Sequence, residues 1–390
     1  MRRTFTGLTR STAYLALASF FSDVATELLY PVLPVFLTQT LGASGRIVGL
    51  VEGIAQATQN LVQGASGWLS DKLERRKPIA LAGYVVAAAA KPLIGLSTGW
   101  PQVLGARFID RLGTGLRSAP RDALVASSAD EAHRGRAFGL EGLGDNLGAF
   151  VGPLLAVFLL VGWRVELTTI FYLAGIPGLF AICMLALVRE RPVEARAKST
   201  LDVHLSGFPA KYWRYLLVTA VFGLGNSSNS FLILRTRDIG VSLPATILVY
   251  AAFNLVAALI SYPAGSFSDR FGRRSVLALA FAIFALTYLG FGVTRGAVPI
   301  ASCFVLYGIY QGISRSVGKT LATDLAPPPL HASGVGWYTA TTGLTGLIAS
   351  LVAGYLWDRV DHAAVFLYGA ACATAGIVAL FRFVKSDTRA

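Results

Sequence analysis

Twelve apolar runs, each long enough to cross a lipid bilayer, constrain this chain more than any other feature. They lie near residues 12–38, 45–66, 78–98, 101–123, 136–160, 166–188, 213–235, 242–263, 275–293, 297–321, 333–356 and 362–384. A helix needs roughly 20 apolar residues to span the hydrocarbon core. Hydrophobic residues make up 54% of the chain and charged residues only 14%. The sequence therefore predicts an all-α integral membrane protein with twelve transmembrane helices.

The apolar runs form two sets of six, separated by the longest polar stretch of the chain. This stretch, residues 189–212, is rich in charge and contains two prolines, as linkers often do. We therefore expect an N-terminal six-helix bundle at residues 1–188, a cytoplasmic linker at 189–212 and a C-terminal six-helix bundle at 213–390.

Lysine and arginine are concentrated in every second gap between the runs. Lys72, Arg75 and Arg76 lie in one such gap, whereas the opposite gaps hold isolated arginines such as Arg164. Basic residues in short connections stay on the cytoplasmic side. We therefore expect both termini in the cytoplasm and the protein in the cell (inner) membrane. The net charge of +13 is spread over these gaps, so no nucleic-acid partner is expected.

The residues that usually bind metals show no site spacing. Cys183, Cys303 and Cys372 each fall inside an apolar run, and the four histidines lie in polar connections. Neither set has the pattern of a zinc site or a disulfide framework. No recognisable set of nucleophile, base and orienting group is present either. We expect no metal, no cofactor and no enzymatic activity.

A ten-residue segment occurs twice, at equivalent places in the two sets. Residues 67–76 have the sequence GWLSDKLERR, and residues 265–274, which begin 198 positions later, have GSFSDRFGRR. Gly115 and Gly312 correspond at nearly the same offset. A near-constant offset indicates duplication of a six-helix unit, with the halves related by an axis along the membrane normal.

The repeated segment resembles the signature loop of the major facilitator superfamily of secondary transporters, with Glu74 in place of a usual glycine in the first copy. In that family the loop aspartate braces a cytoplasmic gate against a helix N-terminus and an arginine, both of which stabilise a carboxylate. The resemblance implies a cytoplasmic gate formed by Gly67, Asp71, Arg75, Arg76, Gly265, Asp269, Arg270, Arg273 and Arg274.

Two further patterns resemble the same family. Arg111 followed by Gly115 lies midway through the fourth run. Gly148-x-x-x-Gly152-Pro153 in the fifth run is similar to a pattern associated with antiporters and drug exporters, although two leucines replace the glycine pair that usually follows. These small residues also permit close helix packing. The resemblance implies two bundles around a central cavity that work by alternating access.

Acidic and basic residues inside the apolar runs are functional candidates, because a charge in hydrocarbon costs several kcal/mol. Asp23 and Glu27 lie four residues apart on one face of the first run, and Asp110 and Arg111 lie in the middle of the fourth. A carboxylate in a low-dielectric site takes up a proton more readily than in water, and a nearby arginine opposes this. We expect these four residues to couple protons to movement, and a static salt-bridge network is the alternative.

The other polar positions within the runs are expected to line the substrate cavity. They are Tyr30, Glu52, Gln56, Arg107, Asp145, Asn226, Asn229, Asn254, Tyr307 and Gln311. Carboxylates are concentrated in the first half, which favours proton handling by the N-terminal bundle. The acids suit cationic substrates, whereas Arg107, Arg111 and Arg235 suit anions, so the substrate charge stays open.

The sequence favours proton-coupled export of a small organic compound by a monomer embedded in the lipid bilayer. One alternative is a proton-coupled symporter that imports a small metabolite. Alternatives of other classes are a non-transporting membrane sensor with a transporter fold and an intramembrane enzyme. The sequence contains no recognisable signalling domain, which disfavours the sensor.

Overall fold

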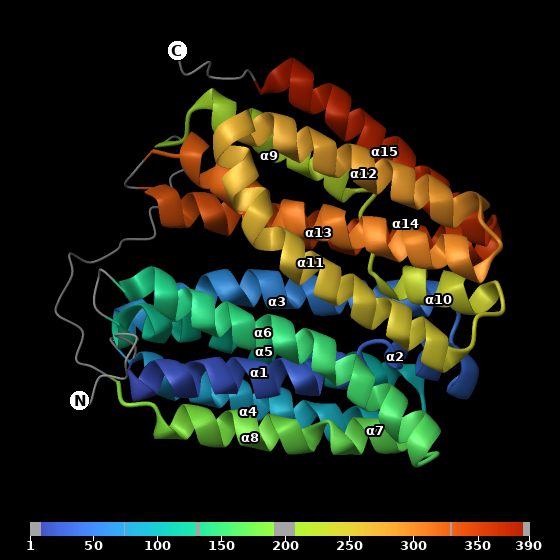
Figure 1. The fold of residues 1–390 in the computed structure, drawn as a ribbon, viewed down its shortest axis with the longest axis horizontal. Helices are drawn as coiled ribbons and strands as arrows, with labels where there is room; N and C mark the ends of the chain where they lie inside the picture. The colour runs from blue at the N-terminus through green and yellow to red at the C-terminus, as the bar shows by residue number, and fades with distance from the viewer. Residues whose placement is uncertain (1–8, 74, 130–132, 191–206, 328–329, 385–390) are drawn as a thin grey trace. The chain divides into compact units, whose positions relative to one another are not determined.

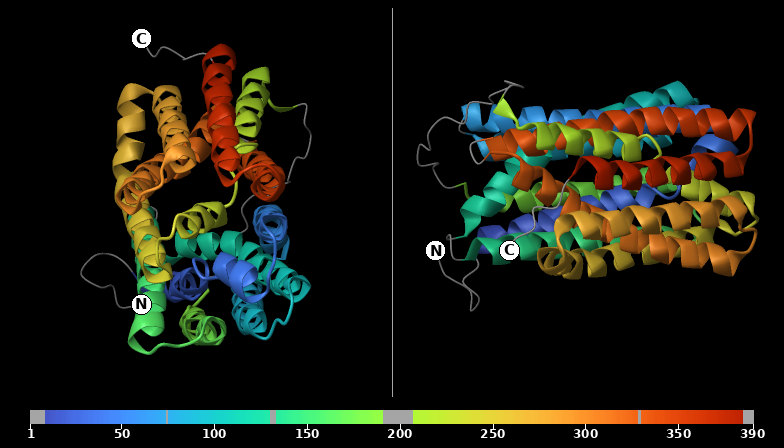
Figure 2. Two further views of the ribbon diagram at one scale, coloured as in Figure 1. Left: turned by 90° about the vertical axis from the view of Figure 1, so that its right-hand side faces the viewer. Right: turned by 90° about the horizontal axis from the view of Figure 1, so that it is seen from above.

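The computed structural model describes residues 9–73, 75–129, 133–190, 207–327 and 330–384, without the side chains of 68–69, 71–73, 134–135, 262 and 331–332. Nearly all of these residues are helical, and no strand occurs among them. The chain divides into two compact units. Unit 1 contains Met1–Gly42 and Ile54–Thr200, and unit 2 contains Ala43–Gly53 and Leu201–Ala390. In each unit the long helices run alongside one another (Figures 1 and 2).

Unit 1 is a bundle of long helices with short helical pieces at their ends. Its helices are α1 (Arg10–Leu29), α2 (Leu33–Val35), the π-helix η1 (Phe36–Thr40), α4 (Arg76–Gly95), α5 (Trp100–Ser128), α6 (Arg134–Val157), the π-helix η3 (Phe158–Gly162), α7 (Leu167–Leu173) and α8 (Gly175–Leu187). Helix α3 (Gly45–Leu73) belongs to unit 1 from Ile54 onward. Helix α1 packs against α6 and α8, and α4 packs against α5 and α8.

The starts of α1 and α4 in unit 1 have side-chain partners. Thr9 accepts a hydrogen bond from the Thr12 backbone N–H and so caps α1. At α4, the Glu190 carboxylate accepts from the backbone N–H groups of Arg76 at 2.7 Å and Lys77 at 3.3 Å. The first N–H groups of a helix have no partner within the helix, and a carboxylate there also interacts favourably with the helix dipole. Glu190 thus ties the chain that follows α8 to the start of α4.

Unit 2 contains seven helices among the described residues. They are α9 (Ala210–Gly223), α10 (Ser230–Asp238), α11 (Leu243–Phe271), α12 (Arg273–Val293), α13 (Ala297–Leu325), α14 (His331–Arg359) and α15 (His362–Phe383). Helix α11 packs against α13, and α12 packs against α13 and α15. Helix α9 lies against α14 and α15. Ser242 caps α11, and Asp361 caps α15.

The start of α3 groups with unit 2 because it is bonded to α14. The Asp358 carboxylate accepts hydrogen bonds from the backbone N–H groups of Gly45 at 2.8 Å and Arg46 at 2.9 Å. The helices approach closely here, since a Cβ atom added at Gly354 would lie 2.6 Å from the Gly45 carbonyl oxygen. The described residues do not include 191–206, which form most of the predicted linker.

Nine helices among the described residues are long and apolar enough to cross a membrane. They coincide with nine of the twelve predicted runs. The other three runs, 45–66, 101–123 and 213–235, fall on α3, α5 and the α9–α10 pair. Helix α5 contains many charged residues, and the third run is broken into helices of 14 and 9 residues. Length and hydropathy therefore identify nine spans. The other three runs do not meet these criteria, because they contain polar residues or are broken into shorter helices.

Candidate functional site

A charged cluster occupies the interior of unit 1, with Asp110 at its centre. Lys91 Nζ on α4 donates to Asp110 Oδ1 at 2.7 Å, and Arg107 Nη1 donates to Asp110 Oδ2 at 3.0 Å. Arg111 Nε lies 3.5 Å from the same Oδ2. The side chains of Lys91, Arg107 and Asp110 are 1–2% exposed. Three cations thus surround one buried carboxylate. Removing charged groups from water is costly unless each of them is paired.

Arg111 also contacts α3. Its Nη1 donates to Gln59 Oε1 at 3.0 Å. On the same face of α5, Gly115 lies so close to α3 that an added Cβ atom would be 2.7 Å from the Gln59 carbonyl oxygen. The arginine and the glycine singled out in the fourth run therefore both contact one turn of α3.

A second group of charges joins α5 to α6 and α1. Arg121 Nη1 lies 3.2 Å from Glu141 Oε1 and 3.4 Å from Asp145 Oδ1. Ser19 on α1 donates from Oγ to Glu141 Oε1 at 2.7 Å and accepts from Arg121 Nη1 at 3.2 Å. Asp145, a predicted cavity residue, is thus an ion-pair partner of Arg121.

Asp23 faces a different arginine from the one considered in the sequence. Its Oδ1 lies 4.0 Å from Arg117 Nη2, whereas Arg111 is bonded to Asp110 and Gln59. Glu27 is half-buried one turn further along α1. The patterns in the sequence did not select Arg117. Arg117 lies in the same apolar run as Arg111, six residues further on. Any charged residue in such a run is a candidate functional residue, and this was the one signal in the sequence that could have found Arg117.

The glycines of α6 lie directly on the turn of α1 that bears both acids. A Cβ atom added at Gly148 would lie 2.8 Å from the Asp23 Cβ atom. One added at Gly152 would lie 3.0 Å from the Glu27 carbonyl carbon. A side chain at either position would push the two helices apart, since real Cβ atoms do not approach other atoms so closely. The Gly148–Gly152 pattern therefore sets how near α6 lies to the two carboxylates.

The first helix of each set is interrupted at an equivalent position. Helix α1 ends at Leu29 and is followed by a turn through residues 30–32, where Pro31 has no backbone N–H to continue the helix. Helix α9 ends at Gly223 and α10 begins at Ser230. The offset of 198 between the repeats aligns residue 30 with residue 228, inside the second interruption. In membrane transporters built from two repeats, interrupted helices in corresponding positions point to the binding site.

The second interruption brings predicted cavity residues together. Asn226 Nδ2 donates to the Tyr310 hydroxyl at 3.2 Å, and the Tyr307 hydroxyl donates to Asn229 Oδ1 at 2.8 Å. Both tyrosines lie on α13. Of the remaining predicted cavity residues, Glu52 and Asn254 are buried, Tyr30 and Gln311 are half-buried and Gln56 is exposed. Gln56 Nε2 donates to Asn60 Oδ1 on its own helix.

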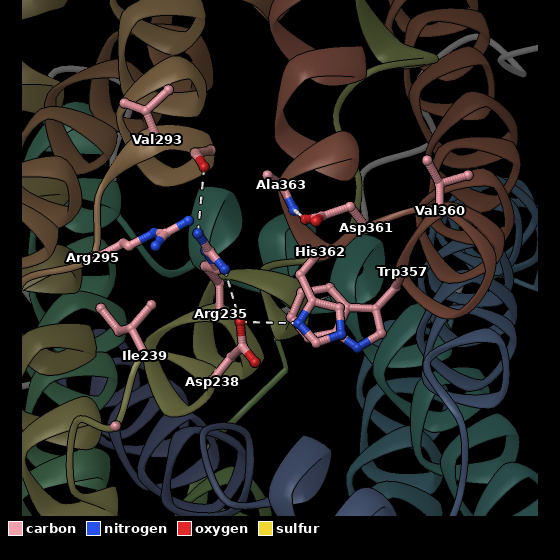
Figure 3. A pocket seen from close by; sticks show the side chains of 12 residues that line it. Arg235, Asp238, Ile239, Val293, Arg295, Trp357, Val360, Asp361, His362 and Ala363 are labelled. Carbon is pink, nitrogen blue, oxygen red and sulfur yellow. Dashed lines mark hydrogen bonds and ion pairs between the residues drawn. The ribbon is translucent and has the colours of Figure 1, made fainter.

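A cavity of about 870 Å³ lies at the end of unit 2 where α14 meets α15. Arg235 and His362 reach the same carboxylate oxygen, Asp238 Oδ2, at 2.8 and 2.9 Å (Figure 3). Arg235 also donates to the carbonyl oxygens of Phe291 and Gly292 at the end of α12. The sequence offered Arg235 as a polar residue of a span but gave no sign of this cluster, whose members come from three separate helices.

The predicted gate residues lie in the two copies of the repeated segment, and the structure describes the side chains of the second copy more fully. In the first copy the Asp71 side chain is not described, Arg75 is exposed, and Gly67 lies close to Ala119 on α5. In the second copy Arg273 forms ion pairs with Asp269 at 3.5 Å and with Asp324 on α13.

Three further members of the predicted gate belong to the second copy. Arg274 Nη2 donates to the Phe381 carbonyl oxygen on α15 at 2.9 Å. Arg270 is exposed and lies over the Phe271 ring, and an added Cβ at Gly265 would meet nothing within 4 Å. The second copy therefore links α11 and α12 to α13 and α15.

Residues 15–233 and 215–390 match the family model of the Major Facilitator Superfamily. The chain belongs to this family. It is 31% identical over 381 residues to an uncharacterized transporter of this type from Methanocaldococcus jannaschii. The aligned region covers 96% of this chain and 95% of that protein. The predicted all-α fold of this superfamily is confirmed, and the protein is a multi-pass membrane transporter rather than an enzyme.

More distant relatives have different printed functions. A maltose permease of Geobacillus stearothermophilus is 26% identical over 93% of the chain and 92% of its own length. The multidrug resistance protein MdtH of Aeromonas hydrophila is 26% identical over 88% of the chain and 87% of its own length. The crystal structure of the nucleoside transporter NupG superimposes with a TM-score of 0.78 at 14% identity, covering 97% of this chain and 100% of that chain. At that identity the likeness concerns the fold alone.

Proposed function

We propose that this protein is a proton-coupled exporter of a small organic compound, working as a monomer in the cell (inner) membrane with both termini in the cytoplasm. The proposal rests mainly on the contact between α6 and α1. The exporter-like glycine pattern on α6 lies against the turn of α1 that bears Asp23 and Glu27. The two features that suggest proton-coupled export therefore meet at one place in unit 1.

Proton coupling requires a carboxylate whose charge changes the stability of a conformation. Asp23 lies between Arg117 on α5 and the close α1–α6 contact. Protonation would cancel its attraction to Arg117 and so favour a different arrangement of α1 and α5. The alternative, a static network, would keep Asp23 ionised and paired throughout the cycle. Asp110 and Arg111 would hold α5 in place while α1 responds.

We also propose where substrate and gate lie. Tyr30, Arg107 and Asp145 in unit 1 and the Asn226–Tyr310 and Asn229–Tyr307 pairs in unit 2 would contact substrate. The paired loops beginning at Gly67 and Gly265 would form the cytoplasmic gate. The functional bundles would be residues 1–188 and 213–390, joined by the linker at 189–212.

The named relatives include both a multidrug resistance protein and a permease, so they support export and import alike. Similarity to a multidrug resistance protein favours export. Similarity to a maltose permease, and the missing glycine pair after Pro153, favour the second candidate, a symporter that imports a small metabolite. Each candidate predicts a different direction of proton movement relative to substrate.

The test uses inverted membrane vesicles with an acid interior, monitored by a pH-sensitive dye. Lipophilic cations, organic acids and sugars are added in turn. Export predicts that at least one compound drains the gradient with the wild-type protein and fails to do so with Asp23→Asn or Glu27→Gln. Glu166→Gln is the matched control, because Glu166 is an exposed acid at the start of α7. Normal drainage by both unit-1 variants would refute coupling at these acids.

The same compounds are added to right-side-out vesicles to test the second candidate. If no compound drains inverted vesicles while right-side-out vesicles accumulate one under an inward proton gradient, the protein is an importer. If purified protein in liposomes moves none of the compounds, export of these compound classes is refuted.

A further inference from the structure

The interruption between α9 and α10 contains backbone oxygens that accept no hydrogen bonds. Helix α9 ends at Gly223, and α10 begins at Ser230. Between them, the carbonyl oxygens of residues 224–227 accept no hydrogen bond from the described residues. Carbonyl groups at the C-terminal end of a helix also carry partial negative charge. The end of α9 therefore presents a group of acceptors that need an electropositive partner.

Buried hydroxyl groups lie at the same interruption. Ser227 is 6% exposed, and Ser230 and Tyr288 are 0% exposed. None of their three hydroxyl oxygens has a hydrogen-bond partner among the described residues. The Tyr288 hydroxyl reaches the interruption from α12, where it faces the uncharged side chain of Ser227. Leaving a buried polar group without a partner is costly, and native proteins satisfy such groups with ordered water or an ion.

Close packing against α15 brings the backbone and hydroxyl oxygens together. A Cβ atom added at Gly225 would lie 2.8 Å from the Gly369 carbonyl oxygen. One added at Gly369 would lie 2.8 Å from the Gly225 carbonyl oxygen and 2.6 Å from Tyr288 Cε1. The Gly225 carbonyl group and the Tyr288 ring therefore contact the same turn of α15, next to Ser227.

Acceptors outnumber free donors in this region. The backbone N–H groups of residues 230–232 already donate to Ser228 and Asn229, so the start of α10 offers no free donor there. Asn226 donates from Nδ2 to the Tyr310 hydroxyl, and its Oδ1 is a further acceptor. An excess of oxygen acceptors favours a cation over a group that must itself accept hydrogen bonds.

The charge of the cluster limits which cation it suits. Gly225, Ser227 and Tyr288 supply uncharged oxygens only. Calcium sites in proteins generally include carboxylates, and burying two positive charges without a counter-charge is very costly. In membrane transporters, unwound backbone carbonyls and the C-terminal ends of half-helices coordinate monovalent ions such as Na⁺.

We propose that the interruption between α9 and α10 binds a monovalent metal cation. Its ligands are the Gly225 carbonyl oxygen and the hydroxyl oxygens of Ser227 and Tyr288. The cation satisfies these buried oxygens and the negative end of α9, and it thereby fixes α9 and α12 against α15. This site lies in unit 2 and is separate from the proton handling proposed for unit 1.

The test is the melting temperature of the purified full-length protein in detergent at constant ionic strength. Sodium chloride or potassium chloride replaces choline chloride in steps. A cation site predicts a saturable rise with at least one metal salt, of about 2 °C at ten times the half-saturating concentration. Equal melting temperatures in all three salts would overturn the proposal and assign the buried oxygens to ordered water.

Two variants locate the site, and a third is the control. Ser227→Ala and Tyr288→Phe each remove one hydroxyl oxygen and little volume. Each is expected to raise the half-saturating salt concentration about tenfold, as the loss of one interaction with a charge would. Ser261→Ala removes a hydroxyl that already bonds to the Ala257 carbonyl oxygen of its own helix, so it should respond to salt as wild type does.

Either variant alone can decide, if the other does not fold. A wild-type response to salt in Ser227→Ala or in Tyr288→Phe would contradict the proposed ligands. The salt titration also fails separately from the proposed function. If wild-type vesicles drain a proton gradient while the melting temperature ignores the salt, export stands and the cation site is wrong.

Discussion

The interiors of the two units differ in chemistry although both halves of the sequence contain the repeated segment at residues 67–76 and 265–274. Unit 1 buries charge, with Lys91, Arg107 and Asp110 almost wholly removed from solvent. Unit 2 buries aromatic rings: the Phe222 and Phe281 rings stack at 3.9 Å, and further aromatic contacts extend from them along α12 and α13. Its carboxylates Asp238 and Asp358 lie at the ends of α10 and α14, and Glu52 on the start of α3 is its buried acid among the described residues.

This difference shows how duplicated bundles can divide a task. Charges buried in a low-dielectric interior change energy strongly when one proton is added or removed. Stacked rings and tyrosine–asparagine hydrogen bonds respond little to protons at neutral pH, because tyrosine and asparagine do not titrate there. We infer that unit 1 is built to respond to protons and unit 2 to present a stable polar surface at the interruption between α9 and α10.

The largest expected effect is in the charged cluster of unit 1. Asp110→Asn removes the carboxylate that three cations share, and breaking a buried pair in this way costs about 3–5 kcal/mol. We expect a marked loss of thermal stability of the detergent-purified protein, measured as the temperature at which half of it stays monodisperse. Asp122→Asn on the same helix is the control, since the Asp122 side chain is 44% exposed. Equal losses in the two variants would contradict a special role for the cluster.

A smaller effect is expected at the charged end of unit 2. Asp238→Asn weakens the hydrogen bond from Arg235 and removes the carboxylate that lies 2.9 Å from His362 Nδ1, and a hydrogen bond to a charged group contributes about 1.5–3 kcal/mol. The same melting assay should show an intermediate loss. Asp361→Asn, which keeps an oxygen able to cap α15, is expected to melt close to wild type. If Asp238→Asn is as stable as Asp361→Asn, the cluster in Figure 3 does not hold α10 to α15.

The smallest effect is expected in the aromatic core. Phe284→Leu keeps most of the apolar volume and loses one set of ring contacts, with Tyr288 at 3.9 Å among them. Volume-conserving changes and lost aromatic pairs together cost about 1–2 kcal/mol. A loss larger than that of Asp110→Asn would reverse the comparison between the units.

Sequence patterns predicted the fold well because helical spans and a repeated loop are local signals. The family and the all-α fold are confirmed, and the offset between the repeats also aligns the two interruptions. Patterns did not predict which of four arginines on α5 faces Asp23, because helix periodicity fixes a face but not the rotation and depth of the neighbouring helix. They also missed the Asp238–His362 pair, whose members lie 124 residues apart and meet only through tertiary packing.

The division of labour itself is tested most directly by comparing proton-driven export with substrate counterflow in the absence of a pH gradient. The probe is the compound that drains the gradient of wild-type vesicles. The account predicts that Asp23→Asn abolishes proton-driven export but retains counterflow, because the substrate contacts are intact. It predicts that Tyr307→Phe, which loses the bond to Asn229, weakens both modes in parallel. If Asp23→Asn loses both modes equally while Tyr307→Phe loses only the proton-driven one, the assignment of proton handling to unit 1 is wrong.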